Sequence, residues 1–236
     1  MANTQYVTAN RLTTEASEAR KRVLLFGAPV VLVLCFVFPG AWWWFLAAFL
    51  IIVLNAGSIK RAGAEGEDST FEMLSSLPDS YTILNQVPVP NKESRTGHTE
   101  LDFIVVGPNG VFVIEVKNNN SEIVGSEEER EWVVHKVGRK GAPYTASMRN
   151  PVRQLKSQIW ALRNFTTERG YKTWIEGIVF FSNPNSSLRF KGIPSVPILL
   201  HSGLTDHILN YKPKYAPGKL DKVVQDLAAI KQSANA

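Results

Sequence analysis

The sequence has very little cysteine and histidine, which limits the chemistry that it can support. Its only cysteine, Cys35, lies inside an apolar block, so neither an intramolecular disulfide nor a cysteine-based zinc site can form. A single cysteine is consistent with a reducing compartment. We treat the four histidines as surface or structural residues, because they show no metal-ligand spacing; they are His98, His135, His201 and His207.

Charge is missing from one long stretch near the N-terminus, residues 23–54. A single straight helix over this stretch would be ~48 Å long at ~1.5 Å per residue. The hydrocarbon core of a membrane needs only ~30 Å, and Pro39-Gly40 favours a break at the middle. We therefore expect a transmembrane helical hairpin with rather short halves, in which Trp42, Trp43 and Trp44 lie at headgroup level; a re-entrant hairpin that enters the membrane only in part is the alternative.

Basic residues flank this stretch on both sides, at positions 20–22 and 60–61. They favour the cytoplasmic side, so both ends should be cytoplasmic, which requires an even number of crossings. The expected organisation is a flexible polar tail over residues 1–19, a membrane hairpin with basic flanks over 20–61, and a cytoplasmic domain over 62–236. A buried globular hairpin is the alternative, whereas a secretory signal peptide does not fit a block of this length.

The net charge of +5 and the pI of about 9.3 suit nucleic acid or anionic lipid as a partner. Basic flanks of membrane segments explain the same balance equally well. A loose basic set surrounds the helix expected over 150–165, where it could contact a phosphate backbone or simply form a solvated face. This set consists of Arg139, Lys140, Arg149, Arg153, Lys156 and Arg163.

The part of the chain after the apolar block carries patterns of both helices and strands. Apolar residues at helical spacing and the Asn150-Pro151 start predict helices over 64–77, 150–165 and 220–230. Runs rich in β-formers predict strands over 81–89, 101–106, 111–117, 132–137, 174–181 and 196–200. This order indicates an α/β or α+β fold with a mixed β-sheet flanked by helices.

The informative residues lie in the strands over 101–106 and 111–117, which Gly107-Pro108-Asn109-Gly110 should join as a hairpin. Glu115 and Lys117 project from one face because one residue separates them. With a two-residue turn, Asp102 lies opposite Glu115, with Cβ atoms ~5 Å apart. A type I turn with a bulge at Gly110 would move Asp102 to the other face, so the register stays open here.

Two carboxylates at that distance repel each other unless a cation lies between them. Asp102 and Glu115 are therefore candidate metal ligands, and Mg²⁺ suits a site of one or two carboxylates with water and phosphate oxygens. In phosphodiester hydrolysis such an ion polarises the phosphate and activates a water, while Lys117 would orient that water or stabilise developing charge. An ordinary Glu–Lys pair at a strand end is the alternative interpretation.

Five short motifs follow one another between residues 63 and 181, and their order and spacing are more specific than any one of them. They are Gly66-Glu67, Glu100-Leu101-Asp102, the run from Gly110 to Asn118, Gly125-Ser126-Glu127 followed by Trp132, and the run from Asn150 to Gln154. Together they resemble the nuclease-related domain (NERD) family, which belongs to the PD-(D/E)xK nuclease superfamily. Leu101 stands where the superfamily name has proline. A proline at that position takes no part in metal binding, so the difference does not affect the site.

The resemblance implies a restriction-endonuclease-like fold, a divalent metal (Mg²⁺ or Mn²⁺) and a core motif of Asp102, Glu115 and Lys117. It adds Glu67 as the acidic residue of the first helix and Gln154 as the polar residue of the helix after the core. Without it, Glu67 would be a solvated residue at a helix start, and Gln154 an exposed helix residue. Asn150 could equally be the N-cap of its helix.

Two functions follow as hypotheses. The first is a membrane-anchored, metal-dependent nuclease that hydrolyses nucleic acid, preferably DNA, on the cytoplasmic side of the inner membrane. The second is a catalytically inactive nuclease-fold module that binds nucleic acid or a membrane protein complex. Both include membrane lipid as a partner. We expect Trp132, Trp160 and Trp174 to belong to the core rather than to stack on bases.

Overall fold

The computed structural model describes residues 1–137, 141–171 and 173–235. It divides into two compact units. One consists of Met1–Thr8 together with Gly66–Ala236, and the other of Ala9–Glu65.

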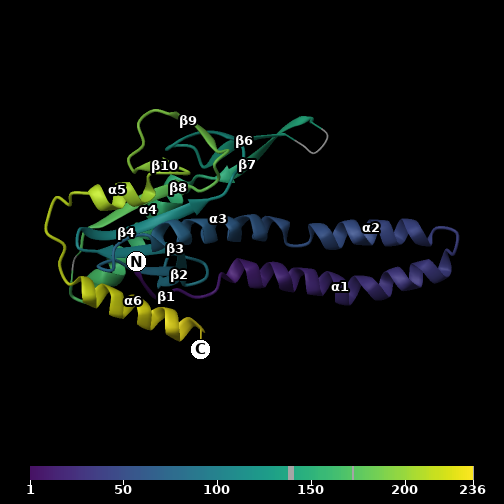
Figure 1. The fold of residues 1–236 in the computed structure, drawn as a ribbon, viewed down its shortest axis with the longest axis horizontal. Helices are drawn as coiled ribbons and strands as arrows, with labels where there is room; N and C mark the ends of the chain where they lie inside the picture. The colour runs from purple at the N-terminus through teal and green to yellow at the C-terminus, as the bar shows by residue number, and fades with distance from the viewer. Residues whose placement is uncertain (138–140, 172, 236) are drawn as a thin grey trace. The chain divides into compact units, whose positions relative to one another are not determined.

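The larger unit is built on a six-stranded mixed sheet with the order β1-β2-β3-β4-β8-β10 (Figure 1). The pairs β2–β3 and β3–β4 are antiparallel, and the other three pairs are parallel. The predicted mixed sheet flanked by helices is therefore confirmed. Its strands are β1 (Asn3–Tyr6), β2 (Thr82–Pro90), β3 (His98–Gly107), β4 (Gly110–Lys117), β8 (Ile175–Phe181) and β10 (Ile198–Leu200).

A second, four-stranded sheet has the order β7-β6-β5-β9. Only β6 was expected from the sequence. β7 and β9 alternate only weakly, because their inward side chains are few and only partly buried, so neither strand was singled out. The strands are β5 (Glu122–Ser126), β6 (Glu131–Val137), β7 (Pro143–Arg149) and β9 (Ser187–Lys191).

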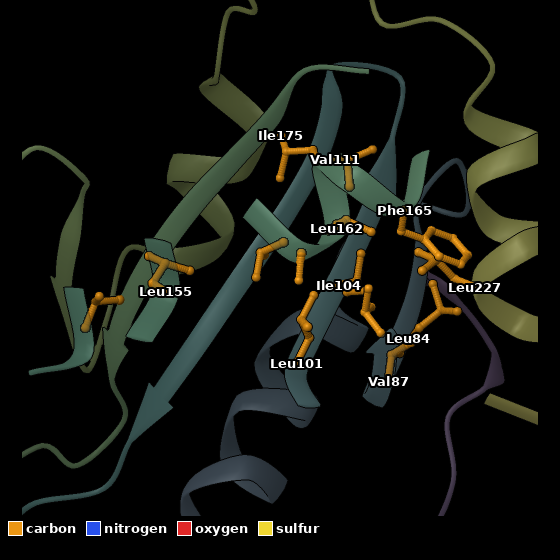
Figure 2. Close-up of a cluster of buried hydrophobic side chains, with 14 of the residues drawn as sticks. Leu84, Val87, Leu101, Ile104, Val111, Leu155, Leu162, Phe165, Ile175 and Leu227 are labelled. Carbon is orange, nitrogen blue, oxygen red and sulfur yellow. The ribbon is translucent and has the colours of Figure 1, made fainter. Parts of the chain in front are cut away.

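Helices cover both faces of the six-stranded sheet. Side chains of α4 and α6 pack on one face (Figure 2). Trp132 from the second sheet belongs to the same apolar cluster. Side chains of α3 and α5 pack on the other face. The seven-residue α5 was not expected, because it is too short to show a helical period. The helices are α3 (Ser58–Ser75), α4 (Pro151–Glu168), α5 (Leu204–Asn210) and α6 (Leu220–Asn235).

The first residues are not the flexible tail that we expected over residues 1–19. β1 pairs with β2 at the edge of the sheet, and α1 begins at Arg11. The buried Lys231 on α6 donates to the carbonyl of Tyr6 at 2.8 Å. The side chain of Asn85 on β2 makes two hydrogen bonds to the backbone of Thr8: its Oδ1 accepts the N–H, and its Nδ2 donates to the carbonyl. These bonds join distant parts of the sequence, so local composition could not reveal them.

The smaller unit contains two helices, α1 (Arg11–Val37) and α2 (Trp42–Asn55), joined by a turn that includes Pro39-Gly40 (Figure 1). They pack closely at Gly27, where a Cβ atom would lie 2.6 Å from the ring of Phe49. Among the described residues, one helical stretch, Trp42–Ser75, is long and apolar enough to cross a membrane. The two membrane crossings remain a prediction.

Candidate functional site

The β3–β4 hairpin has the register of the two-residue turn. Gly107 pairs with Gly110 and Val106 with Val111, and Gly110 takes a φ of 142° without a bulge. Continuing this register places Asp102 on the row of Glu115. The predicted juxtaposition of the two carboxylates is therefore present, and the alternative shifted register is not.

The two strands separate at this row. The last paired residues are Phe103 and Ile114. Beyond them, the side chain of Asp102 takes the place of a backbone acceptor, since its Oδ2 accepts the N–H of Val116 at 2.9 Å. Asp102 therefore lies in the opening between two strands, and it is half-buried.

The backbone of β2 is irregular where this strand meets the same row. Leu84 and Val87 share one apolar cluster, although residues three apart in a regular strand face opposite sides. Between them, Gln86 has a φ of 48°, a left-handed conformation that non-glycine residues adopt infrequently. The pairs on either side put Gln86 opposite Asp102. A row of Gln86, Asp102 and Glu115 therefore crosses three adjacent strands.

Glu115 is fully buried and both of its oxygens are bonded. Its Oε1 accepts a bond from Lys117, which is also an ion pair. Its Oε2 accepts a bond from Nε2 of Gln158 on α4 at 2.6 Å. A buried carboxylate needs such partners, because water cannot solvate it. Gln158 is fully buried too, and its Oε1 has no hydrogen-bond partner among the residues that the structure describes.

Lys117 stays protonated in this environment. Burial lowers the pKa of its ammonium, but the charges of Glu115 and Asp102 and the bond to Glu115 outweigh burial, so the net pKa is raised. Its Nζ also donates to Oε1 of Gln154 at 3.3 Å. The side chain is therefore a fixed positive charge between the strand row and α4.

Glu67 reaches the site because Gly66 brings α3 very close to the ends of β4 and β8. A Cβ atom at Gly66 would lie 2.6 Å from Cβ of Asn118 and 2.9 Å from Oγ of Ser182. Only a residue without a side chain fits there. Glu67 then accepts a hydrogen bond from Nε2 of Gln86 at 2.8 Å, which connects α3 to the strand row.

Two carboxylates of the site, Glu67 and Asp102, hold protons more tightly than usual. Burial is the largest cause that raises the pKa of Glu67 to about 7, and the charge of Glu115 adds to it. Burial and then the charge of Glu115 raise the pKa of Asp102 well above its usual value, against the opposing effects of Lys117 and the Val116 N–H. Repulsion between neighbouring carboxylates is the condition that a cation would relieve.

The donor set fits a hard divalent cation. Carboxylate oxygens are the ligands that Mg²⁺ prefers, and it usually takes only one or two of them, with water and phosphate completing the shell. Asp102 and Glu115 supply that number. In the part of the chain that the structure describes, no group of three or more His, Cys, Asp or Glu side chains is arranged to hold a metal. The remaining ligands would therefore come from solvent or substrate.

The structure brings all five residues proposed from the sequence into one connected site: Glu67, Asp102, Glu115, Lys117 and Gln154. Their catalytic roles remain predictions. Sequence reasoning missed two further members, Gln86 and Gln158. The spacing of four between Gln154 and Gln158 puts both on one helix face, which was a usable signal. Nothing in the sequence around Gln86 marks its unusual backbone conformation.

Other predictions have mixed outcomes. The Asn150 side chain caps α4 by accepting the N–H groups of Val152 and Arg153. Trp132 is fully buried, but Trp160 and Trp174 are 41% and 39% exposed, so assigning those two to the core was wrong. Both lie where one side of their segment faces solvent. Within the basic set, Arg139 and Lys140 lie outside the described residues, and Lys156 forms an ion pair with Glu127.

Comparison with known proteins agrees with this geometry. Residues 62–182, just over half of the 236-residue chain, match the family model described as the nuclease-related domain. An uncharacterized protein of Bacillus anthracis is 36% identical over 104 residues, which are 44% of this chain and 46% of that protein. The match therefore spans about half of that relative. No solved structure matches the chain. From the family match and the motif residues it contains, we conclude that the chain belongs to the nuclease-related domain family, a family of the PD-(D/E)xK nuclease kind.

Proposed function

We propose that the protein is a divalent-metal-dependent nuclease, anchored in the inner membrane, that hydrolyses phosphodiester bonds of nucleic acid, with DNA as the preferred substrate, on the cytoplasmic side. The observation that carries the proposal is the placement of Asp102 and Glu115 on one row, with the Lys117 ammonium beside them. Two carboxylates and a fixed cation form a site that suits a metal and a phosphate together.

Asp102 and Glu115 would hold the ion, Mg²⁺ or Mn²⁺. When bound, it would polarise the phosphate and lower the pKa of a water ligand. Lys117 keeps its positive charge, so it stabilises negative charge that develops on the phosphate. Gln158 fixes Oε2 of Glu115, and Gln154 fixes the ammonium. Pre-positioned groups of this kind need no reorganisation during the reaction.

Glu67 adds a group that can exchange a proton near neutral pH. Its pKa of about 7 lies close to the operating pH, which is where a general acid or base works best. Gln86 holds one of its oxygens. We assign Glu67 to proton transfer with solvent around the reacting water, and not to the inner ligand shell.

The membrane anchor is proposed from the exposed apolar surface of α1 and α2. Large apolar side chains on these helices are mostly exposed, which is unfavourable in water unless lipid or protein covers them. They include Leu25, Phe26, Leu32, Val33, Phe36, Trp42, Trp44, Leu50, Ile51 and Ile52. Basic residues at both ends of this stretch favour a cytoplasmic location for the nuclease-related domain.

Cleavage assays test the nuclease proposal. The full chain in detergent is incubated with single- and double-stranded DNA and RNA, in Mg²⁺, Mn²⁺ or EDTA. We expect metal-dependent cutting that Asp102→Asn and Lys117→Met abolish, whereas the exposed Asp79→Asn and Lys92→Met variants retain it. Metal should also stabilise the wild type, by about 2.7 kcal/mol at a hundredfold excess over Kd.

No cutting of any substrate by a folded protein that metal does not stabilise would contradict the proposal. It would favour the alternative function, a catalytically inactive module that binds nucleic acid or a membrane protein complex. One observation already fits that alternative, namely that Lys117 satisfies Oε1 of Glu115 directly.

Cysteine labelling tests the anchor, because Cys35 is the only cysteine to remove. In a Cys35→Ser background, Gly40→Cys should react with a membrane-impermeant maleimide from the outer face of the inner membrane, and Asp79→Cys only from the inner face. Release of the protein from membranes by alkaline carbonate would contradict the anchor. Labelling of Gly40→Cys from the inner face alone would replace two crossings by a re-entrant segment.

A further inference from the structure

A basic groove lies next to the candidate active site, at the N-terminal end of α4. Its volume is about 540 Å³. The described residues of its lining include Arg130, Glu131, Arg149, Asn150, Arg153 and Gln154. Three arginines and one glutamate give this lining a net charge of about +2, because arginine stays protonated in proteins.

Asn150 builds the groove. Its side-chain amide donates to the carbonyls of Ser126, Glu127 and Glu129, while its Oδ1 caps α4. Its backbone N–H also bonds the carbonyl of Arg130 at 3.1 Å. One buried residue thus fastens the loop before β6 to the start of α4.

The same arrangement collects the arginines. Arg130 ends the fastened loop, and Arg153 lies in the first turn of α4. Arg149 is the last residue of β7, where it pairs across the strands with Glu131. Each arginine thus comes from a different element, and Asn150 holds the three elements together.

The three guanidinium groups are available to an anion. None of them forms an ion pair with a carboxylate of the described residues, and all three residues are exposed. The one side-chain bond among them runs from Arg153 to the carbonyl of Glu128, at a long 3.5 Å. Convergent arginines without carboxylate partners suit phosphate, which they can bind with two parallel hydrogen bonds.

Gln154 connects the groove to the active site. It lines the groove, and its Oε1 accepts the ammonium of Lys117. None of the described residues that line the groove is aromatic, so they offer no surface for the base stacking that single-strand binders use. Its chemistry therefore suits the sugar–phosphate backbone, which carries no sequence information.

We propose that Arg130, Arg149 and Arg153 bind the backbone phosphates of the nucleic-acid strand that flank the bond to be cut, and so position that strand without selecting its sequence. That these phosphates flank a bond to be cut rests on the proposed nuclease function. Phosphate binding itself can be tested without any cleavage.

The test measures binding of a short fluorescein-labelled single-stranded DNA to the full chain in detergent, by anisotropy in EDTA over a salt series. The groove variant is R130Q/R149Q/R153Q. The control variant, K212Q/K214Q/K219Q, removes the same charge from exposed positions outside the groove. Each phosphate contact on a single strand contributes about −0.7 to the slope of log K against log salt, so losing three should lower its magnitude by about 2.

A second variant works in the opposite direction. Glu131→Gln removes the one negative charge of the groove lining and should strengthen binding, a gain that damage to the fold would not imitate. Thermal unfolding of every variant shows that the fold is retained.

A slope reduced in the groove variant but kept in the control supports the inference. Equal slopes in the two variants overturn it, even if the wild type cuts nucleic acid. If cutting is absent with every metal, the groove variant can still show a smaller slope of log K against log salt. In that case phosphate binding in the groove is supported and the nuclease proposal fails. If the wild type does not bind the strand at all, the inference that the groove binds phosphate is overturned.

Discussion

Glu67→Gln should make the metal-free protein more stable at pH 8 and leave it nearly unchanged at pH 4.5. In the folded protein burial raises the pKa of Glu67 to about 7, from an ordinary value of 4.5. Between pH 4.5 and about pH 7, Glu67 of the folded protein holds a proton that Glu67 of the unfolded chain has released. Stability must therefore fall as pH rises through this window.

The magnitude follows from the size of the shift. One pKa unit corresponds to about 1.36 kcal/mol. The full difference would be about 3 kcal/mol, and partial exposure of Glu67 reduces it to roughly 2 kcal/mol. Glutamine has the shape of the protonated acid and can still accept the bond from Gln86, so it removes the penalty without removing the contact.

The assay is urea unfolding of the full chain in detergent, followed by far-ultraviolet circular dichroism at several pH values. EDTA is present throughout, because a bound cation would itself lower the carboxylate pKa values. Glu72→Gln, an exposed position on the same helix, is the matched control. The stability difference between Glu67→Gln and the wild type should grow between pH 4.5 and pH 8.

If Glu67→Gln and the wild type gave parallel curves of stability against pH, as Glu72→Gln should, the burial argument for Glu67 would be refuted. The position of Glu67 beside the strand row would then not raise the pKa of its carboxyl. A role for Glu67 in proton transfer near neutral pH would lose its support as well.

Three further predictions concern the packing of the site. Gln158→Leu should lower the free energy of unfolding by about 2 kcal/mol, since it removes the bonds to Glu115 and to the carbonyl of Glu100, and loss of the side-chain Oε1 offsets this only in part; urea unfolding checks this, and a gain in stability would contradict it. Gly66→Ala should destabilise by about 1–3 kcal/mol despite the better helix propensity of alanine, because its Cβ would overlap Asn118; thermal unfolding at or above wild-type stability would show that α3 can shift without cost. A fragment of residues 62–236 should be less stable than the full chain by roughly 2 kcal/mol, because Lys231 loses its Tyr6 acceptor and the edge of β2 is left unpaired; equal hydrogen-exchange protection of β2 in both would argue against this.

Much of the site was predictable because its core is local. Gly107 to Gly110 is a turn sequence, and the alternation of the two flanking strands then sets which residues share a row. That short-range geometry made Asp102, Glu115 and Lys117 candidates, and the resemblance to the nuclease-related domain family assigned them to one core motif. The helix that carries Gln154 was equally readable, because Asn150-Pro151 is a start signal that acts within one turn.

The register nevertheless needed the structure. Pro108 left a bulged turn as a second solution that the sequence could not exclude. Packing of both strand faces against helices decides between the two, since a shift by one residue would turn every apolar side chain of the strand toward the wrong layer.

The sequence by itself determined the apolar N-terminal block, the β3–β4 hairpin and the capped helix α4, because composition, turn chemistry and periodicity act over a few residues. Only the tertiary structure decided that β1 completes the sheet, that Gly66 brings Glu67 to the strand row and that Gln158 fixes Glu115. It also decided that three arginines from different elements form one groove. Those features join residues far apart in the chain, and their positions depend on how the layers pack rather than on any local pattern.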